Sequence, residues 1–208
     1  MTGIKVGVLR LGLTVAAMWL MAYGKLDAGK YNPVLKISDP GPQWKSLPGI
    51  DGKKYSFDSF KKFEVLVIVF TCNSCDYAVD YEDRLVAFAR NHTGAGKRVG
   101  MVAVNVNRIP ADSLPEMKRR AEKKGFTFPY LFDETQETAR AYDAVCTPDI
   151  FVYGQEGKLM YRGRVDDNWK EPNQVKQRDL QAAVDHILVE KEVSSKQIPS
   201  MGCSIKWK

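Results

Sequence analysis

Residues 65–75 read VLVIVFTCNSC and carry the clearest structural signal in the chain. The apolar run 65–70 has the length and the β-branched content of a strand that is buried on both faces. After Cys75, aromatic and apolar side chains recur at helical spacing, which predicts an amphipathic helix. The sequence therefore places a Cys-x-x-Cys pair at a strand-to-helix junction, in the first turn of the helix.

This position suits dithiol–disulfide chemistry. Free backbone N–H groups and the positive end of the helix dipole favour a thiolate at the start of a helix. A spacing of three residues puts both sulfurs on one helical face, within disulfide reach. We expect Cys72, nearer the helix end, to be the exposed attacking thiol and Cys75 to be the resolving thiol.

Length and composition indicate one globular domain with extensions. The chain has 208 residues, of which 44% are hydrophobic and 27% are charged, as in ordinary globular proteins. The net charge of +6 is modest, and the basic residues within 118–124 are interpreted as a solvated helix face. Basic residues interleaved with aromatic ones, which would predict a nucleic-acid partner, do not occur.

The first 24 residues resemble a targeting segment. Lys5 and Arg10 precede an almost wholly apolar stretch, residues 11–24, which suits a signal-peptide core and is short for a membrane span of about 20 residues. We expect export to the periplasm or another extracytoplasmic space, with cleavage after Gly24. The alternative is an uncleaved N-terminal anchor, and a membrane is expected as a partner only in that case. Outside the reducing cytosol, disulfides can persist as resting states.

The rest of the chain divides into a linker at 25–42, a domain at 43–192 and a C-terminal tail at 193–208. The elements expected in the domain are a short hairpin and helical turn within 43–63, the strand 65–70, a helix to about residue 91, a strand at 99–106, a helix at 115–124, a short segment at 128–132, a short helix at 134–142, a hairpin of 149–153 with 158–162, and a helix at about 175–190. This order predicts an α/β architecture in which helices flank a central mixed β-sheet.

Thr147-Pro148 is the second informative element, because it stands between the short helix and the hairpin. With the strand–Cys-x-x-Cys–helix unit, it makes residues 43–190 resemble the thioredoxin fold. The chain is similar to extracytoplasmic thiol–disulfide oxidoreductases of the thioredoxin-like superfamily. Within them it resembles peroxiredoxin-like members with a Cys-Thr-Pro-Asp stretch, here residues 146–149. The resemblance implies that a cis-Pro148 loop lies against the cysteine pair and that the Thr147 backbone binds a substrate segment as an added strand.

Two departures from these families are visible in the sequence. Thioredoxins carry a buried aspartate six residues before the first cysteine, where this chain has Leu66. Glu64, Asp76 and Asp149 are the candidate substitutes, each with an alternative interpretation as a plain surface acid. Peroxiredoxins place a threonine three residues before the peroxide-reducing cysteine and a proline four before that, but counting back from Cys75 gives Cys72 and Ile68.

Two further cysteines have open roles. Cys146 is either a small buried hydrophobe or a third redox thiol beside the active-site loop. Cys203 lies in the tail, where Ile205 and Trp207 could dock on the domain and bring it near Cys146 or the active pair. Cys203 would then form a structural or regulatory disulfide, and an unpaired thiol is the alternative.

We therefore expect a thiol–disulfide oxidoreductase that uses a Cys72/Cys75 couple and needs no cofactor. Its partners would be protein or small-molecule thiols and disulfides, together with a redox donor or acceptor protein, and the direction of exchange stays open. One alternative is a copper(I)- or zinc-binding redox protein, although the two histidines, His92 and His186, are not expected to be ligands, so no metal site is assigned. The other alternative is a thiol peroxidase whose reactive residue is Cys75.

Overall fold

The computed structural model describes residues 34–194 and 196–208. The predicted signal peptide or anchor, residues 1–24, lies outside this part of the chain. Within the described residues, no helix has the length and apolar character needed to cross a membrane.

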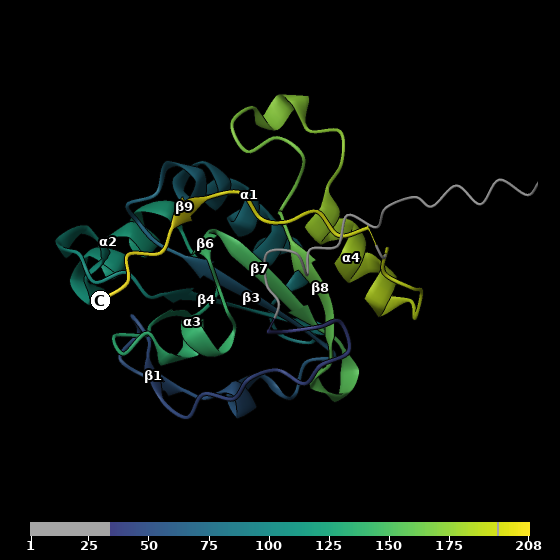
Figure 1. Ribbon diagram of the computed structural model, residues 1–208, viewed down its shortest axis with the longest axis horizontal. Coiled ribbons are helices and arrows are strands. Elements are labelled where there is room, and N and C mark those ends of the chain that lie inside the picture. Colours follow the sequence, from purple (N-terminus) through teal and green to yellow (C-terminus); the bar gives the residue numbers. More distant parts are fainter. Residues whose placement is uncertain (1–33, 195) are drawn as a thin grey trace, which may run out of the picture.

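The described residues form a mixed five-stranded sheet with helices on both sides, together with two small two-stranded sheets (Figure 1). The strands are β1 Leu47–Pro48, β2 Lys54–Tyr55, β3 Val65–Thr71, β4 Val99–Asn105, β5 Tyr130–Phe132, β6 Cys146–Thr147, β7 Asp149–Tyr153, β8 Leu159–Gly163 and β9 Cys203–Ser204. The helices are α1 Asp76–His92, α2 Leu114–Lys124, α3 Glu137–Ala141 and α4 Asp179–Leu188. The predicted α/β fold class is confirmed.

The main sheet has the order β5-β4-β3-β7-β8. Strand β3 is central: it pairs parallel with β4 and antiparallel with β7. In the parallel pair, Thr71 at the end of β3 lies opposite Asn105 at the end of β4. The loops that follow these two strands therefore leave the sheet at the same edge, and one of them carries the cysteine pair.

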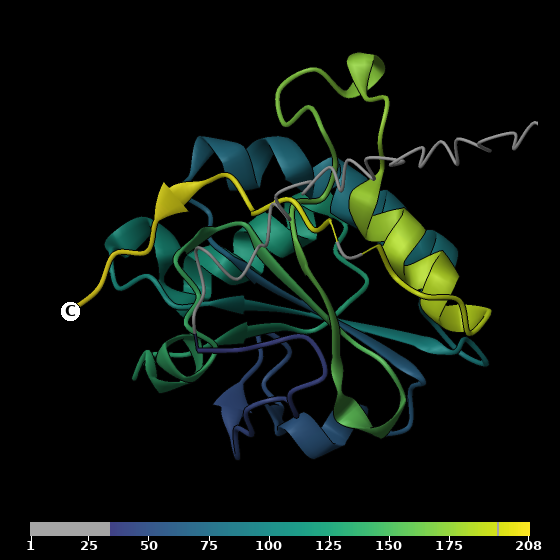
Figure 2. The ribbon, with the colours of Figure 1, turned by 45° about the vertical axis from the view of Figure 1, so that its right-hand side comes forward.

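Alternate side chains of β3 enter opposite halves of the core, as the period of a strand requires. Val65, Val67 and Val69 pack in the cluster that also holds buried side chains of α1, α2 and α4. The intervening side chains pack with α3 and the segment around β1 and β2. Figure 2 shows the sheet between these two layers. All of β3 is buried, and each fully buried Val or Ile contributes about 1.5–3 kcal/mol, so β3 is a rigid support for the cysteines.

Part of the predicted linker is bonded to the domain. Ser38 N–H donates to the Leu159 carbonyl oxygen at 2.7 Å, and Leu159 N–H donates to the Asp39 carbonyl oxygen at 2.9 Å. Leu35 is buried in the core. Because β8 is the outer strand of the sheet, this segment satisfies an edge that would otherwise present free backbone groups. Residues 34–42 are therefore better assigned to the domain.

The last helix begins later than the sequence predicts. It starts at Asp179, because the Gln177 carbonyl oxygen accepts a hydrogen bond from Asp167 N–H instead of entering a helical turn. Gly125, predicted to cap the helix at 115–124, does so with the left-handed conformation that favours glycine (φ 67°).

Candidate active site

The cysteine pair occupies the junction between β3 and α1. Helix α1 begins at Asp76, and Cys75 is its N-cap residue with extended backbone angles. The prediction that both cysteines lie in the first helical turn is therefore wrong: Cys72 follows β3 directly, and Cys75 is the residue at the helix end. The dipole argument made for Cys72 consequently applies to Cys75.

The Thr147-Pro148 loop lies against both sulfurs, as the resemblance implied. The peptide bond between Thr147 and Pro148 is cis. The hydroxyl of Thr147 lies 3.2 Å from Cys72 Sγ, and its carbonyl oxygen accepts a hydrogen bond from the Cys75 thiol at 2.9 Å. One residue of this loop thus contacts the reactive atom of each cysteine.

A buried carboxylate beside the pair escaped the sequence analysis. Asp112 is fully buried and accepts hydrogen bonds from Asn73 N–H and from the Ser74 hydroxyl, both at 2.6 Å. Asn107 Nδ2 donates to the same carboxylate at 3.1 Å. Ser74 Oγ also lies 3.7 Å from Cys72 Sγ, so the hydroxyl bridges the carboxylate and the sulfur. The only sequence signal was that Asp112 follows β4, whose end lies beside the end of β3.

The acids considered in the sequence analysis lie elsewhere. Glu64 pairs with Arg98 on the surface, and Asp76 is exposed in the first turn of α1. Asp149 is buried, and burial raises its pKa to about 6, but its carboxylate accepts a hydrogen bond from Val145 N–H at 3.2 Å on the far side of Thr147-Pro148. Asp112 is therefore the buried carboxylate that lies beside the pair.

The two thiols have opposite tendencies to ionise. The hydrogen bond from Cys72 lowers the pKa of Cys75 to about 4, with further support from hydrogen bonds of Cys203 and of the Ala78 N–H. The same Cys72–Cys75 hydrogen bond, followed by burial, raises the pKa of Cys72 far above its ordinary value, and the Asp112 charge adds to this. The Thr147 carbonyl opposes ionisation of Cys75, because it accepts a hydrogen bond only from the protonated thiol. Cys75 is nonetheless the sulfur that faces the backbone donors, so the lowered pKa of the pair belongs to Cys75 and the raised one to Cys72.

Neither sulfur of the pair is open to solvent. Cys72 and Cys75 are each only 2% exposed. The expectation of an exposed Cys72 is therefore wrong, because the tail and side chains of neighbouring elements cover both residues. Tyr77 and Cys203 are the partly buried side chains packed on the pair.

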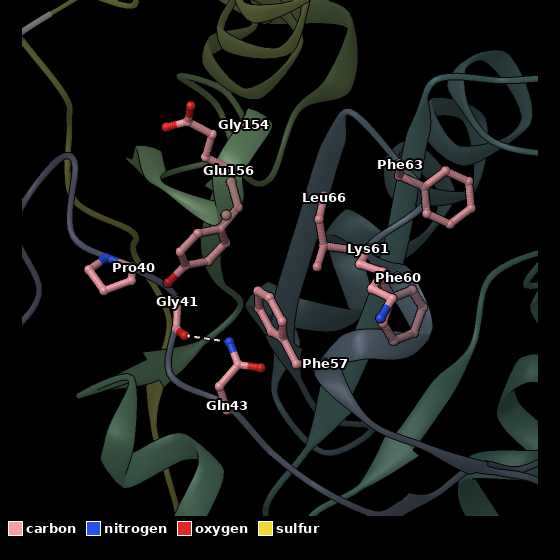
Figure 3. A pocket seen from close by; sticks show the side chains of 12 residues that line it. Pro40, Gly41, Gln43, Phe57, Phe60, Lys61, Phe63, Leu66, Gly154 and Glu156 are labelled. Carbon is pink, nitrogen blue, oxygen red and sulfur yellow. Dashed lines mark hydrogen bonds between the residues drawn. The ribbon is translucent and has the colours of Figure 1, made fainter.

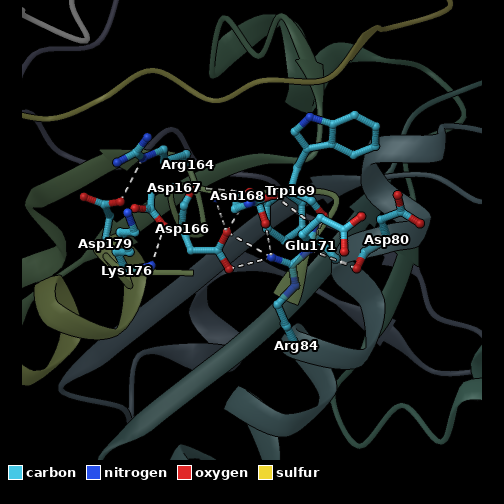
Figure 4. A network of polar contacts seen from close by, with 11 residues as sticks. Asp80, Arg84, Arg164, Asp166, Asp167, Asn168, Trp169, Glu171, Lys176 and Asp179 are labelled. Carbon is cyan, nitrogen blue, oxygen red and sulfur yellow. Dashed lines mark hydrogen bonds and ion pairs between the residues drawn. The ribbon is translucent and has the colours of Figure 1, made fainter. Parts of the chain in front are cut away.

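A polar network anchors one wall of the site (Figure 4). Arg84 on α1 donates to the Asp166 carboxylate at 2.7 and 2.9 Å and to the Asn168 carbonyl oxygen at 2.7 Å. This fixes the loop after β8 so that the ring of Trp169 lies against that of Tyr77, with centroids 4.1 Å apart. Tyr77 in turn packs on the cysteine cluster.

The other two cysteines differ in their relation to the pair. All four cysteines are free thiols in the structure. The Cys146 thiol points to the Pro148 carbonyl oxygen at 3.6 Å, and burial raises its pKa. Cys203 lies on β9, which pairs with β6, and its N–H donates to Cys75 Sγ at 3.4 Å. The tail thus docks beside the active pair, as expected, and Cys203 is a free thiol there.

Comparison with known proteins places the chain in a family. A family model described as the AhpC/TSA family matches residues 37–162. The chain belongs to the AhpC/TSA family. This match spans β3, the cysteine pair and Thr147-Pro148, which confirms the predicted membership of the thioredoxin-like redoxin superfamily.

Solved structures share the fold of this chain. A hypothetical protein from Sinorhizobium meliloti is 35% identical, with a TM-score of 0.77 and coverage of 84% of this chain and 96% of that one. An uncharacterized conserved protein from Geobacillus kaustophilus is 39% identical, with a TM-score of 0.77 and coverage of 83% and 93%. The C-terminal domain of a putative thiol-disulfide oxidoreductase from Bacteroides thetaiotaomicron shares the fold at 16% identity, with a TM-score of 0.58 and coverage of 74% and 97%. None of the curated proteins matches the sequence.

This AhpC/TSA protein also contains a cavity of about 280 Å³ away from the cysteines (Figure 3). Its lining includes Phe57, Phe60, Leu66 and Tyr153, and Leu66 lies near the start of β3, whereas the cysteine pair follows the end of that strand. In residues 34–194 and 196–208, no group of three or more His, Cys, Asp or Glu side chains is arranged to hold a metal ion.

Proposed function

We propose that this AhpC/TSA protein is a thiol–disulfide oxidoreductase in which Cys72 and Cys75 form the exchanging couple. The observation that carries the proposal is the contact of both sulfurs with Thr147, at 3.2 Å for Cys72 and 2.9 Å for Cys75. A dithiol that contacts a backbone segment can exchange a disulfide with a peptide that pairs with that segment as an added strand. The expected substrates are thiols and disulfides of proteins or small molecules.

In the reducing direction, the Cys75 thiolate attacks one sulfur of a substrate disulfide. A mixed disulfide forms, and the other substrate sulfur leaves as a thiolate that takes up a proton. Cys72 then attacks Cys75 Sγ, which releases the second substrate thiol and leaves a Cys72–Cys75 disulfide. Two electrons pass from the protein to the substrate, and the oxidising direction is the exact reverse of these steps.

Cys72 must lose its proton for the second step. Its surroundings include the Asp112 carboxylate, which the Ser74 hydroxyl links to the sulfur. We assign Asp112 the role of a positioning residue that holds the Asn73-Ser74 turn and receives the Cys72 proton through the Ser74 hydroxyl. Buried Asp residues beside a sulfur raise the pKa of the thiol and supply a base close to it.

Export, as predicted from residues 1–24, would place the couple where disulfides persist. A redox donor or acceptor protein would then restore the couple after each exchange.

The proposal is tested by insulin disulfide reduction and by oxidative refolding of a reduced protein. We expect activity in at least one assay and its loss in both Cys72→Ser and Cys75→Ser. Wild-type protein whose thiols have been alkylated beforehand supplies the baseline. Activity that survives either substitution would refute the claim that Cys72 and Cys75 form the exchanging couple.

A thiol peroxidase is the second candidate, because the family match and the lowered pKa of Cys75 both favour a reactive thiolate. There Cys75 would reduce a peroxide to an alcohol or water, and Cys72 would condense with the resulting sulfenic acid, releasing water and forming the disulfide. Peroxide consumption that depends on Cys75, without exchange activity, would favour this candidate.

A further inference from the structure

Strand β9 occupies the edge at which the substrate strand is expected. It pairs antiparallel with β6, with Thr147 opposite Cys203 and Cys146 opposite Ser204. The approach is close: a Cβ atom on Gly202 would lie only 2.1 Å from the Thr147 carbonyl oxygen. Only glycine fits at that point, so the tail lies on Thr147 as an added strand.

The tail is anchored on both sides of Cys203. Downstream, Ile205 is buried, and the Gln136 side chain donates to the Lys206 carbonyl oxygen at 2.9 Å and accepts from Lys208 N–H at 2.9 Å. Upstream, the Ser200 hydroxyl donates to the Gly163 carbonyl oxygen at 2.6 Å. These contacts fix the register that brings Cys203 to the pair.

Cys203 contacts the cysteine pair with both its backbone and its side chain. Its N–H donates to Cys75 Sγ at 3.4 Å, and its side chain packs on the cluster formed by Cys72, Cys75 and Ala78. Cys203 is also the more exposed of the two, being only partly buried. Its sulfur is thus placed beside the sulfur of the N-cap cysteine, as the sulfur of a bound substrate would be.

We infer that Cys203 is a third redox thiol of this protein, which exchanges with the Cys72–Cys75 disulfide to form a Cys75–Cys203 disulfide that latches the tail over the active site. The inference rests on the proposed function, which supplies the Cys72–Cys75 disulfide. The Cys203 thiolate attacks Cys75 Sγ, the Cys72–Cys75 bond breaks, and Cys72 leaves as a thiolate that takes up the proton lost by Cys203. No outside oxidant is consumed, because two electrons move among three sulfurs.

Two physical effects favour this exchange. The tail holds Cys203 within the same molecule, at an effective concentration of about millimolar or above. In the reduced protein, burial and then the hydrogen bond and charge of Cys75 raise the pKa of Cys203, and the second effect disappears once Cys75 is in a disulfide. External substrates must displace β9 to reach the pair, so the latched form is closed to them.

The test uses full-length Cys72→Ser protein treated with oxidised glutathione, followed by acid quenching, alkylation and peptide mass spectrometry. We expect glutathione to join Cys75 and then to be displaced by Cys203, so that the Cys75–Cys203 peptide accumulates. In the double variant Cys72→Ser, Cys203→Ser, the glutathione adduct should remain on Cys75. The yield of peptide linked to Cys75 should fall at least about tenfold, because the intramolecular partner is lost. Ser204→Ala is the matched control on the same strand and should retain the linkage.

A register variant, in which the tail thiol is moved by one residue, tests whether the position of Cys203 matters. Cys203→Ser combined with Ser204→Cys keeps one thiol in the tail but moves it to the opposite face of the strand, because the side-chain period of a strand is two. This variant should not form the link. A link of equal yield in the register variant would show only a loose tail and would overturn the inference.

Failure of the inference and failure of the proposed function give different outcomes. If wild-type protein forms the Cys72–Cys75 disulfide and shows exchange activity, while Cys72→Ser yields only the glutathione adduct, then the inference is wrong and the function stands. If wild-type protein forms no Cys72–Cys75 disulfide and shows no exchange, then the proposed function is wrong and the inference falls with it.

Discussion

Removal of the Asp112 charge should both destabilise the protein and ease the ionisation of Cys72. Asp112 is fully buried and accepts from Asn73, Ser74 and Asn107. Asp112→Asn keeps the shape of the side chain, but its amide nitrogen replaces an acceptor and one donor loses its partner. Because hydrogen bonds to charged groups contribute about 1.5–3 kcal/mol each, we expect the free energy of unfolding to fall by about 2–4 kcal/mol. Urea unfolding followed by circular dichroism measures this.

The effect on Cys72 follows from the separation of the two groups. Ser74 Oγ lies 2.6 Å from the Asp112 carboxylate and 3.7 Å from Cys72 Sγ, so carboxylate and sulfur are within about 6 Å of each other. Two unit charges at that distance repel by about 3 kcal/mol at an effective dielectric constant of about 20. Loss of the carboxylate should therefore favour the Cys72 thiolate by up to about this amount, which corresponds to roughly a hundredfold in its ionisation constant.

The assay is the ultraviolet absorbance of the thiolate, followed during a pH titration. It uses a Cys75→Ser, Cys146→Ser, Cys203→Ser background, in which Cys72 is the remaining cysteine, with and without Asp112→Asn. Glu122→Gln removes one charge from the exposed face of α2 and serves as the matched control. If Cys72 ionises at the same pH with and without Asp112→Asn in a folded protein, then the carboxylate does not act on the sulfur and the proton route through Ser74 is refuted.

Three further changes test other parts of the structure. Burial raises the pKa of Asp149 from 3.8 to about 6, so the folded state holds that proton more tightly than the unfolded state does. The free energy of unfolding should therefore fall by up to about 3 kcal/mol as pH rises from about 4 to 6. Asp149→Asn should remove this pH dependence, as measured by urea unfolding at several pH values. Arg84→Met should cost about 3–5 kcal/mol of unfolding free energy because it leaves the buried Asp166 carboxylate unpaired, and Asp166→Asn in the same chain should restore part of it; equal stability of the single and double variants would contradict this. Gly202→Ala should push β9 off β6 and speed alkylation of the cysteine pair in the reduced protein, as measured by mass spectrometry, and an unchanged rate would mean that the tail does not cover the pair.

The sequence was informative where signals are local. The buried strand β3, the junction after it and helix α1 follow from an apolar run and helical spacing, and the contact of Thr147 with the pair followed from a resemblance. The boundary of α1 did not follow, because helix ends depend on which backbone groups find partners, and a later start than expected leaves Cys72 outside the helix and makes Cys75 its N-cap.

Features that depend on distant segments escaped prediction. Asp112 reaches the pair only because β3 and β4 run parallel with their ends in register, which no short window of sequence reveals. The pairing of β9 with β6 likewise joins the end of the chain to the Thr147 loop. The sequence placed the tail near the domain, but the choice of Cys75 as the neighbour of Cys203 comes from the strand register.

The most direct test of the couple is a redox titration of the wild-type protein in mixtures of reduced and oxidised glutathione. Samples are quenched in acid and alkylated, and the peptide that contains Cys72 and Cys75 is quantified in its linked and alkylated forms. The pair should be oxidised and reduced reversibly, with a ratio of linked to reduced peptide that changes tenfold for about every 30 mV of potential, as for a two-electron couple. A peptide in which both cysteines are alkylated at every mixture, including the most oxidising, would contradict the claim that these two sulfurs exchange a disulfide.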